Sequence, residues 1–300
     1  MSQQTLTSDI EPRRTSQVGF KPLFRAILRH KLSLFGLAVI AGLVFMAIFA
    51  PVIAPYSPTK QDLYRVLAAP SKVHWLGTDN VGRDLLSRII FGSRVSLLVG
   101  VVAALFSALI GTCLGLIAGF RGGWVDNVVM RVTDTFMVFP GLVFVLALSA
   151  ALGPGVKNII ISLVVLGWTG FARIIRGQVL VVRELPYVES ARAAGASNLR
   201  IMLRHVLPNS VAPIIVAFSI SVGAFIMVES GAAFLGLGAQ PPTSSWGREL
   251  RVGYAYIDRN PLFCVWPGLM ISLSVLAFNF VGDGLRDAMD PRLRGERQTR

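Results

Sequence analysis

The chain has 300 residues, of which 53% are hydrophobic and only 15% are charged, whereas soluble domains carry about 25% charged residues. This composition excludes an ordinary soluble domain and favours an integral membrane protein. The net charge of +13 is spread between long apolar runs rather than gathered on one solvated face, so it is typical of cytoplasmic loops and does not indicate nucleic-acid binding.

Six apolar runs approach or reach the length of about 20 residues that crosses the hydrocarbon, which predicts an all-α protein with six transmembrane helices. The runs cover residues 32–54, 95–120, 134–152, 158–176, 211–235 and 262–281. We expect a cytoplasmic tail at 1–31, a first transmembrane helix within 32–56, an extracytoplasmic segment at 57–93, a core at 94–285 and a cytoplasmic tail at 286–300. Both ends are basic and are therefore expected in the cytoplasm, from which an even number of spans follows.

The N-terminal tail is polar and basic for about thirty residues, unlike the short charged region of a cleavable signal. The first span is therefore expected to remain as an anchor.

The second run carries small residues at every fourth position, which lets a neighbouring helix approach closely. These include Ser107, Gly111, Gly115 and Gly119. We expect helix packing along this stripe, with a substrate groove as the alternative. Further on, only a tight turn around Pro154 separates the third run from the fourth, and the uncharged part of the fourth is short because it ends at Ala172, before Arg173 and Arg176.

Motifs for catalysis are missing from the sequence. It has no GxxxxGK[ST] phosphate loop, no GxSxG and no HExxH. Cys113 and Cys264 stand alone, and His30, His74 and His205 lie far apart, so no metal site is expected. We expect no enzyme activity and no cofactor bound by this chain.

The charged stretch between the fourth and fifth runs indicates two short helices. Pro186 suits a first helical turn, Glu189 lies near the positive end of that helix, and Gly195 allows the left-handed residue that ends it. Ser197 can cap a second helix, which we expect to end before Pro208.

In that second helix, four apolar residues follow an i, i+3, i+4, i+7 stripe, and two arginines lie on another face. The stripe consists of Leu199, Met202, Leu203 and Val206. Such a face needs an apolar surface to cover it. That surface is either the chain's own helical bundle or a partner subunit.

This stretch resembles the EAA loop of binding-protein-dependent ABC importer permeases. It has Glu-Ser-Ala at 189–191, glycine at Gly195 and Leu-Pro at 207–208. It departs from the family pattern at Ser190, which is usually Ala, and at His205, which is usually Ile; the histidine form looks like the peptide-importer branch. The resemblance implies a loop at 186–209 that docks into the ATP-binding subunit through Glu189, Ala191, Gly195, Leu199, Met202, Leu203, Val206, Leu207 and Pro208.

Three further segments resemble the second permease of dipeptide, oligopeptide and nickel importers. They are Leu-Gly-Thr-Asp at 76–79 with Gly-Arg-Asp-Leu-Leu-Ser-Arg at 82–88, Phe-Leu-Gly-Leu-Gly-Ala-Gln-Pro-Pro at 234–242 with Trp246-Gly247, and Gly-Asp-Gly-Leu-Arg-Asp at 282–287 with Asp290-Pro291. The resemblance covers residues 30 to 295.

The resemblance implies the type I ABC importer permease (MetI-like) fold, with five core helices and an added N-terminal span. Its implied partners are a second homologous permease subunit, two ABC ATPase subunits that bind ATP and Mg²⁺, an extracytoplasmic solute-binding protein and the lipid of a prokaryotic inner membrane. The implied mechanism is alternating access, in which closure of the ATPase subunits moves the docked loop. The expected substrates are short peptides, with nickel and glutathione as alternatives.

Three acidic residues lie at or inside the spans, where ionisable groups are functional candidates. Pairing with Arg131 would explain Asp134, and capping or pairing near the tail would explain Asp283. Glu229 lies well inside the fifth run, where an unpaired charge is costly. We therefore expect Glu229 to face a cavity or to hydrogen-bond to another span, and it is a candidate for the translocation path.

Two other classes of protein compete with this interpretation. An ion-coupled secondary transporter would need inverted repeats or broken helices around an ion site, and the sequence shows no such repeat. A membrane enzyme or an assembly scaffold is disfavoured by the missing catalytic motifs.

Overall fold

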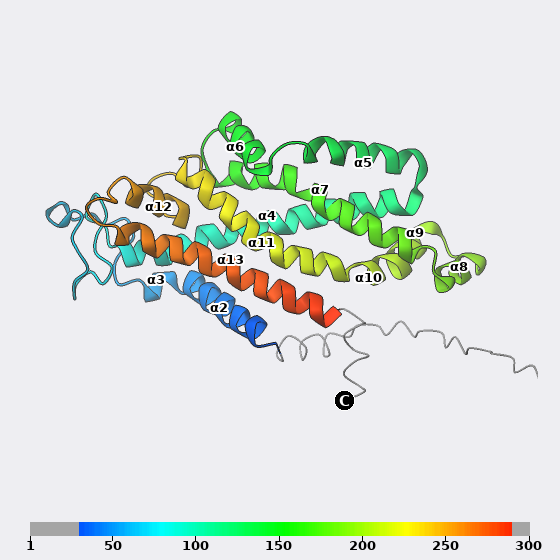
Figure 1. Ribbon diagram of the computed structural model, residues 1–300, viewed down its shortest axis with the longest axis horizontal. Helices are drawn as coiled ribbons and strands as arrows, with labels where there is room; N and C mark the ends of the chain where they lie inside the picture. Colours follow the sequence, from blue (N-terminus) through cyan, green and yellow to red (C-terminus); the bar gives the residue numbers. More distant parts are fainter. Residues whose placement is uncertain (1–29, 290–300) are drawn as a thin grey trace, which may run out of the picture.

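The computed structural model describes residues 30–289 of the chain, so the expected tails lie largely outside it. Within this range the chain is helical, with one isolated bridge between Thr78 and Asp84 and no strand. The long helices run side by side and form an elongated bundle (Figure 1). We call the end that carries α12 (Trp246–Tyr254) the cap end and the end that carries α8 (Pro186–Ala193) the loop end.

Five helices of the described part are long and apolar enough to cross a membrane. They are α2 (Lys31–Ile48), α4 (Leu85–Arg121), α7 (Val156–Val182), α11 (Ala212–Phe234) and α13 (Leu262–Met289). A sixth span exists only if α5 (Gly123–Met137) and α6 (Gly141–Leu152) are counted together, and these two are bent by 88°. The expected third span at 134–152 is therefore not one straight helix. Pro140 stands at the break and disfavours helical backbone in the residue before it.

Three other boundaries differ from the expectation. α4 begins at Leu85, ahead of the apolar run, because the Asp84 side chain accepts the backbone N–H of Ser87 and caps the helix. α7 continues past its arginines to Val182. The first span is broken at Phe49 into α2 and the short α3 (Ala50–Ile53).

The small-residue stripe of α4 faces α7. A Cβ atom added at Gly111 or Gly115 would collide with α7 backbone, and one at Gly119 would press on Val179. Ser107 is buried, with its hydroxyl against Gly167 of α7. The stripe thus lies in a helix–helix contact, where close approach increases van der Waals attraction between helices in lipid.

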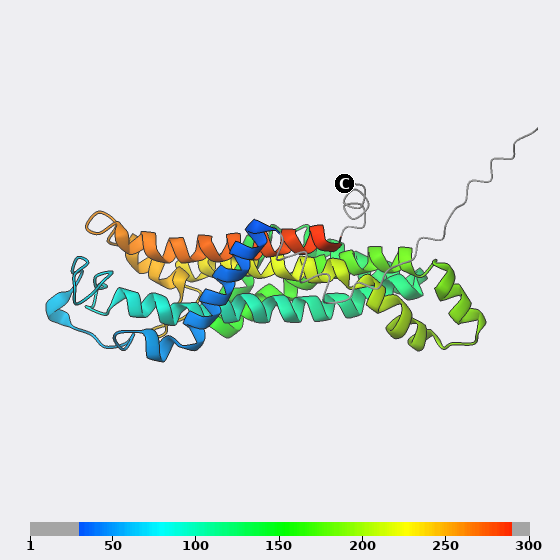
Figure 2. The same ribbon diagram turned by 90° about the horizontal axis from the view of Figure 1, so that it is seen from below.

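A second group of helices packs at the cap end. Leu43, Leu97, Ile226, Trp246 and Phe278 belong to one buried cluster, which joins α2, α4, α11, α12 and α13. α2 crosses the bundle obliquely (Figure 2). Most of its large apolar side chains are exposed, as expected of a helix that contacts lipid.

Candidate functional site

The two expected helices of the 186–209 loop are present. α8 starts with Pro186 in its first turn, and the chain turns at Gly195, whose φ is +80°. α9 (Asn198–Ile201) then begins, and its cap is Ser197, whose side chain accepts the N–H of Arg200. α8 projects beyond the ends of the neighbouring long helices (Figure 1).

The sequence predicts that the second helix ends before Pro208, but in the structure it does not. It continues through a π-helical turn, Met202–Val206, into α10 (Leu207–Ser210). Pro208 has no N–H to donate, and the two side chains that follow it bond back to the preceding turn: Asn209 donates to the carbonyl of His205 and Ser210 to that of Val206. π-helical turns of this kind are frequent at functional sites.

The apolar stripe of this helix is divided between two environments. Val206 is fully buried and Met202 partly buried in a cluster with Ile175 and Val179 of α7. Leu199 and Leu203 instead remain 62% and 50% exposed. The chain's own bundle therefore covers one half of the stripe and leaves the other half open.

The remaining residues of the expected docking set follow the same division. Ala191 and Leu207 pack against the buried cluster, whereas Glu189, Gly195 and Pro208 are exposed. Nearby, burial raises the pKa of the Tyr187 hydroxyl. The loop is thus fixed to the bundle on one side only.

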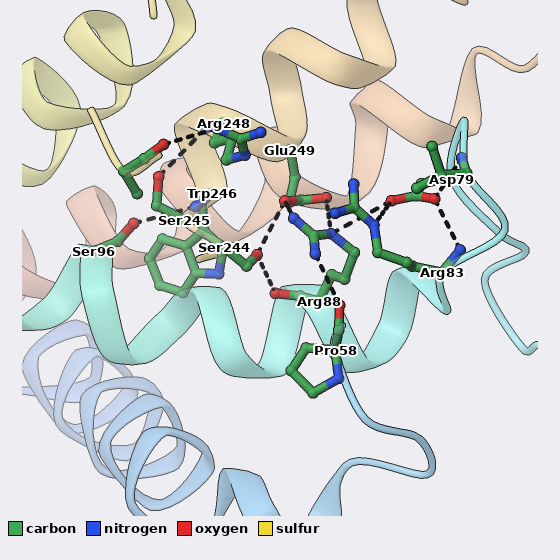
Figure 3. A network of polar contacts seen from close by, with 12 residues as sticks. Pro58, Asp79, Arg83, Arg88, Ser96, Ser244, Ser245, Trp246, Arg248 and Glu249 are labelled. Atoms are coloured by element: carbon green, nitrogen blue, oxygen red, sulfur yellow. Dashed lines mark hydrogen bonds and ion pairs between the residues drawn. The ribbon is translucent and has the colours of Figure 1, made fainter. Parts of the chain in front are cut away.

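The cap end contains a polar cluster that sequence reasoning did not identify. Arg88, in the first turn of α4, is fully buried and forms a two-pronged ion pair with Glu249 of α12, with Nε–Oε2 at 2.8 Å and Nη2–Oε1 at 2.6 Å (Figure 3). Its Nη1 donates to the carbonyl of Pro58 at 2.8 Å, and Asp79 lies 3.6 Å from its Nε. Every nitrogen of this guanidinium group therefore has a partner.

The segment before α4 is built around acidic side chains. Asp79 accepts backbone N–H groups of Val81 and Arg83 and pairs with the Arg83 guanidinium. Asp84 accepts from the Ser87 hydroxyl and lies 2.9 Å from Nδ1 of His74. These contacts explain why a segment rich in turn residues forms a defined structure.

α12 is inserted closely against α4. The Ser244 hydroxyl donates to the carbonyl of Arg88, and the Trp246 indole N–H donates to the carbonyl of Ile89 at 3.1 Å. A Cβ at Gly92 would press on the start of α12. Arg248 points elsewhere and donates to the Ala239 carbonyl, and burial lowers its pKa.

In the sequence, residues 82–88 and 234–247 stand out only through their resemblance to the permease family. The sequence predicts no helix between the fifth and sixth spans. Arg88 and Glu249 are 161 positions apart, so no local pattern links them. Arg88 ends the segment 82–88, whereas Glu249 lies beyond residues 234–247, between Arg248 and Arg251.

The three acidic candidates lie in different environments. Glu229 is only 1% exposed, and its Oε2 accepts the Ser96 hydroxyl of α4 at 3.1 Å, so it does hydrogen-bond to another span. Asp134 pairs with Arg173 of α7 at 2.6 Å. The expected pairing with Arg131 is therefore wrong. Asp283 is exposed and forms no ion pair within residues 30–289.

These features define a polytopic membrane protein whose helical bundle has a buried polar cluster at one end and a partly uncovered loop at the other. The family described as binding-protein-dependent transport system inner membrane component matches residues 111–295, and the N-terminal TM domain of oligopeptide transport permease C matches residues 21–70. The chain belongs to this family of ABC importer permeases, which act in the inner membrane with ATPase and substrate-binding partners.

Curated relatives match over nearly their whole length. A glutathione transport system permease protein of Pectobacterium atrosepticum is 40% identical over 276 residues, which is 92% of each chain. A dipeptide transport system permease protein of Alkalihalophilus pseudofirmus is 39% identical over 284 residues, 95% of this chain and 93% of that one. The glutathione permease protein of Escherichia coli is 42% identical over 273 residues, 91% and 90% of the two chains.

A solved structure of the MetNI methionine ABC transporter in an inward-facing conformation has the same fold. The two chains superpose with a TM-score of 0.55 at 20% sequence identity. The match covers 69% of this chain and 98% of the chain in the MetNI structure. The expected MetI-like permease fold is therefore confirmed.

Proposed function

We propose that this permease imports short peptides that an extracytoplasmic solute-binding protein delivers, and that ATP hydrolysis on partner subunits drives the import. Relatives named for dipeptide and glutathione transport, at similar identity and over more than nine tenths of the chain, support a peptide substrate. Glutathione is itself a tripeptide, so both names describe one chemical class of cargo. The assembly comprises a second homologous permease, two ATPase subunits with ATP and Mg²⁺, the binding protein and this chain.

The exposed half of the loop stripe is the observation that carries the coupling role. Leu199 and Leu203 are exposed on a segment that the opposite face anchors through Val206 and Ile201. Arg200 and Arg204 are exposed beside them. An apolar groove with an acidic rim on the ATPase subunit fits this surface, since helices lay apolar faces into such grooves.

This role puts the loop end in the cytoplasm and the cap end outside. The cycle then follows from differential binding: the ATPase pair in its ATP-bound state holds the docked loop in one position and shifts the spans toward the outward-open state. A ligand can shift an equilibrium only by its difference in affinity for the two states, and ATP supplies that difference.

Reconstitution tests the proposal. The chain is co-expressed with permease, ATPase and binding-protein partners encoded by neighbouring genes, and uptake of a labelled dipeptide, glutathione or Ni²⁺ into proteoliposomes is measured. We expect peptide uptake that needs both ATP and the binding protein. Uptake by this chain alone without nucleotide would identify an ion-coupled carrier, and uptake of Ni²⁺ alone would refute the peptide assignment.

A further inference from the structure

Glu229 is surrounded by hydroxyl groups rather than by cations. Its Oε2 accepts the Ser96 hydroxyl at 3.1 Å and the Ser230 hydroxyl at 3.4 Å. No ion pair of Glu229 occurs within residues 30–289. These two serines lie on α4 and α11.

Ser96 also faces the backbone of α12, as does the cap residue Ser245. The Ser96 oxygen accepts the N–H of Trp246 at 3.3 Å, and the Ser245 oxygen accepts the N–H of Arg248 at 3.4 Å. These N–H groups belong to the start of a helix, where no intrahelical carbonyl is available. The two hydroxyls therefore replace the missing acceptors of the first turn.

A hydroxyl group has one proton to donate and lone pairs that accept. When that proton points to the acceptor at Glu229, the lone pairs of the same oxygen are left for the α12 backbone. The carboxylate thereby sets the direction of the Ser96 hydroxyl, which joins α4 to the start of α12. An apolar side chain at this position would leave that hydroxyl free to rotate away.

We propose that Glu229 is a positioning residue that, through Ser96, fixes the start of α12 against α4 and α11. Gly247 supports this geometry, because a Cβ there would collide with the Ser230 backbone and close approach is required. Arg88 and Glu249 attach α12 to α4, and Glu229 supplies the side-chain link to α11. The cap end consequently moves together with these two spans.

A rigid cap end would matter for transport. A binding protein that docks on the cap end can pass force to the spans only if α12 stays fixed on them. Loss of the link should weaken productive docking more than the maximal rate of ATP hydrolysis. In its effect on transport, the inference rests on the proposed function.

The experiment compares Glu229→Gln with Glu229→Leu in the full complex in nanodiscs. Hydrogen exchange of the α12 amides is measured without substrate, and ATPase activity is titrated with peptide-loaded binding protein. Ser96→Ala is a second test variant. Ser93→Ala is the matched control, because Ser93 is equally buried on α4 but donates only to its own helix, at the Ile90 carbonyl.

Glutamine retains an oxygen that accepts from the same hydroxyls, so Glu229→Gln should stay within about twofold of the parent in both readouts. Glu229→Leu should speed exchange at the first α12 amides about tenfold and raise the half-saturating binding-protein concentration about tenfold, with the maximal ATPase rate retained. Ser96→Ala should change the exchange rate and the half-saturating concentration in the same direction but by less. Ser93→Ala should change neither quantity.

Two results would overturn the inference. If Glu229→Gln were impaired as severely as Glu229→Leu, the negative charge itself would be needed, as in a translocation path that binds the peptide ammonium group. If Glu229→Leu left α12 exchange unchanged, Glu229 would not position α12. The exchange measurement needs no transported substrate, so it decides the inference even if the parent complex failed to import peptides.

Discussion

The two ends of the bundle differ in whether their charged side chains are paired and their apolar side chains are covered. At the cap end, the fully buried Arg88 is paired with Glu249 and lies near Asp79, all within one chain. At the loop end, Leu199 and Leu203 are exposed on the helix that carries Arg200 and Arg204. Within residues 30–289, neither of these arginines forms an ion pair.

This difference shows which end is complete by itself. A buried charge is tolerated only where its partners are already in place, so the cap end must be satisfied before any other subunit arrives. Exposed apolar side chains beside unpaired cations instead favour a surface that another protein covers. Substitutions at the two ends should therefore fail in different ways: the cap end in stability and the loop end in association.

The largest effect is expected at the buried ion pair. Arg88→Met leaves Glu249 buried without its cation, which should destabilise the chain by about 3–5 kcal/mol. Thermal unfolding of the purified permease in detergent measures the loss. The double variant Arg88→Met with Glu249→Leu is the control and should regain most of the stability, because apolar replacement of a whole buried pair is often neutral. A stable Arg88→Met single variant would show that the pair does not support the cap end.

A loss of stability of intermediate size is expected where α4 and α7 are in contact. Gly115→Leu would drive a side chain into the backbone at Ala172, and overpacking of this kind costs about 1–3 kcal/mol or more. Gly177→Leu is the matched control, because a Cβ at Gly177 meets no atom within 4 Å. The same unfolding assay should separate the two variants. Equal stability would mean that the two helices can move apart without cost.

Periodicity and composition were sufficient to predict the bundle, and the four-residue spacing from Ser107 to Gly119 predicted a close helix contact. They could not predict the 88° bend between α5 and α6, because an apolar run has the same composition whether it is straight or broken. Pro140 was the available signal for that break.

The polar cluster at the cap end was beyond sequence reasoning for a different reason. Arg88 and Glu249 meet only because α12 folds back onto the start of α4, and that tertiary contact leaves no local pattern. The loop stripe gave a partial answer: its spacing predicted one apolar face, but the bundle covers only Met202 and Val206 of that face. Leu199 and Leu203 remain exposed.

The smallest effect on stability, and the clearest on assembly, is expected at Leu203. Leu203→Ser removes an apolar contact from the exposed half of the stripe, where a single side chain at an interface typically contributes on the order of 1–2 kcal/mol. The variant should bind the ATPase subunit about tenfold more weakly. The tagged permease should therefore retain less ATPase than the parent does. The unfolding temperature of the isolated permease should not change, because Leu203 is half exposed.

Leu63→Ser is the matched control at the opposite end, since Leu63 is 72% exposed on the short helix Leu63–Arg65. It should leave ATPase retention at the parent level. If Leu63→Ser lost as much ATPase as Leu203→Ser, the loss would reflect a general effect of removing exposed apolar surface. If Leu203→Ser retained full ATPase binding, the exposed half of the stripe would not be the docking surface, and the division between a self-sufficient end and a partner-dependent end would fail.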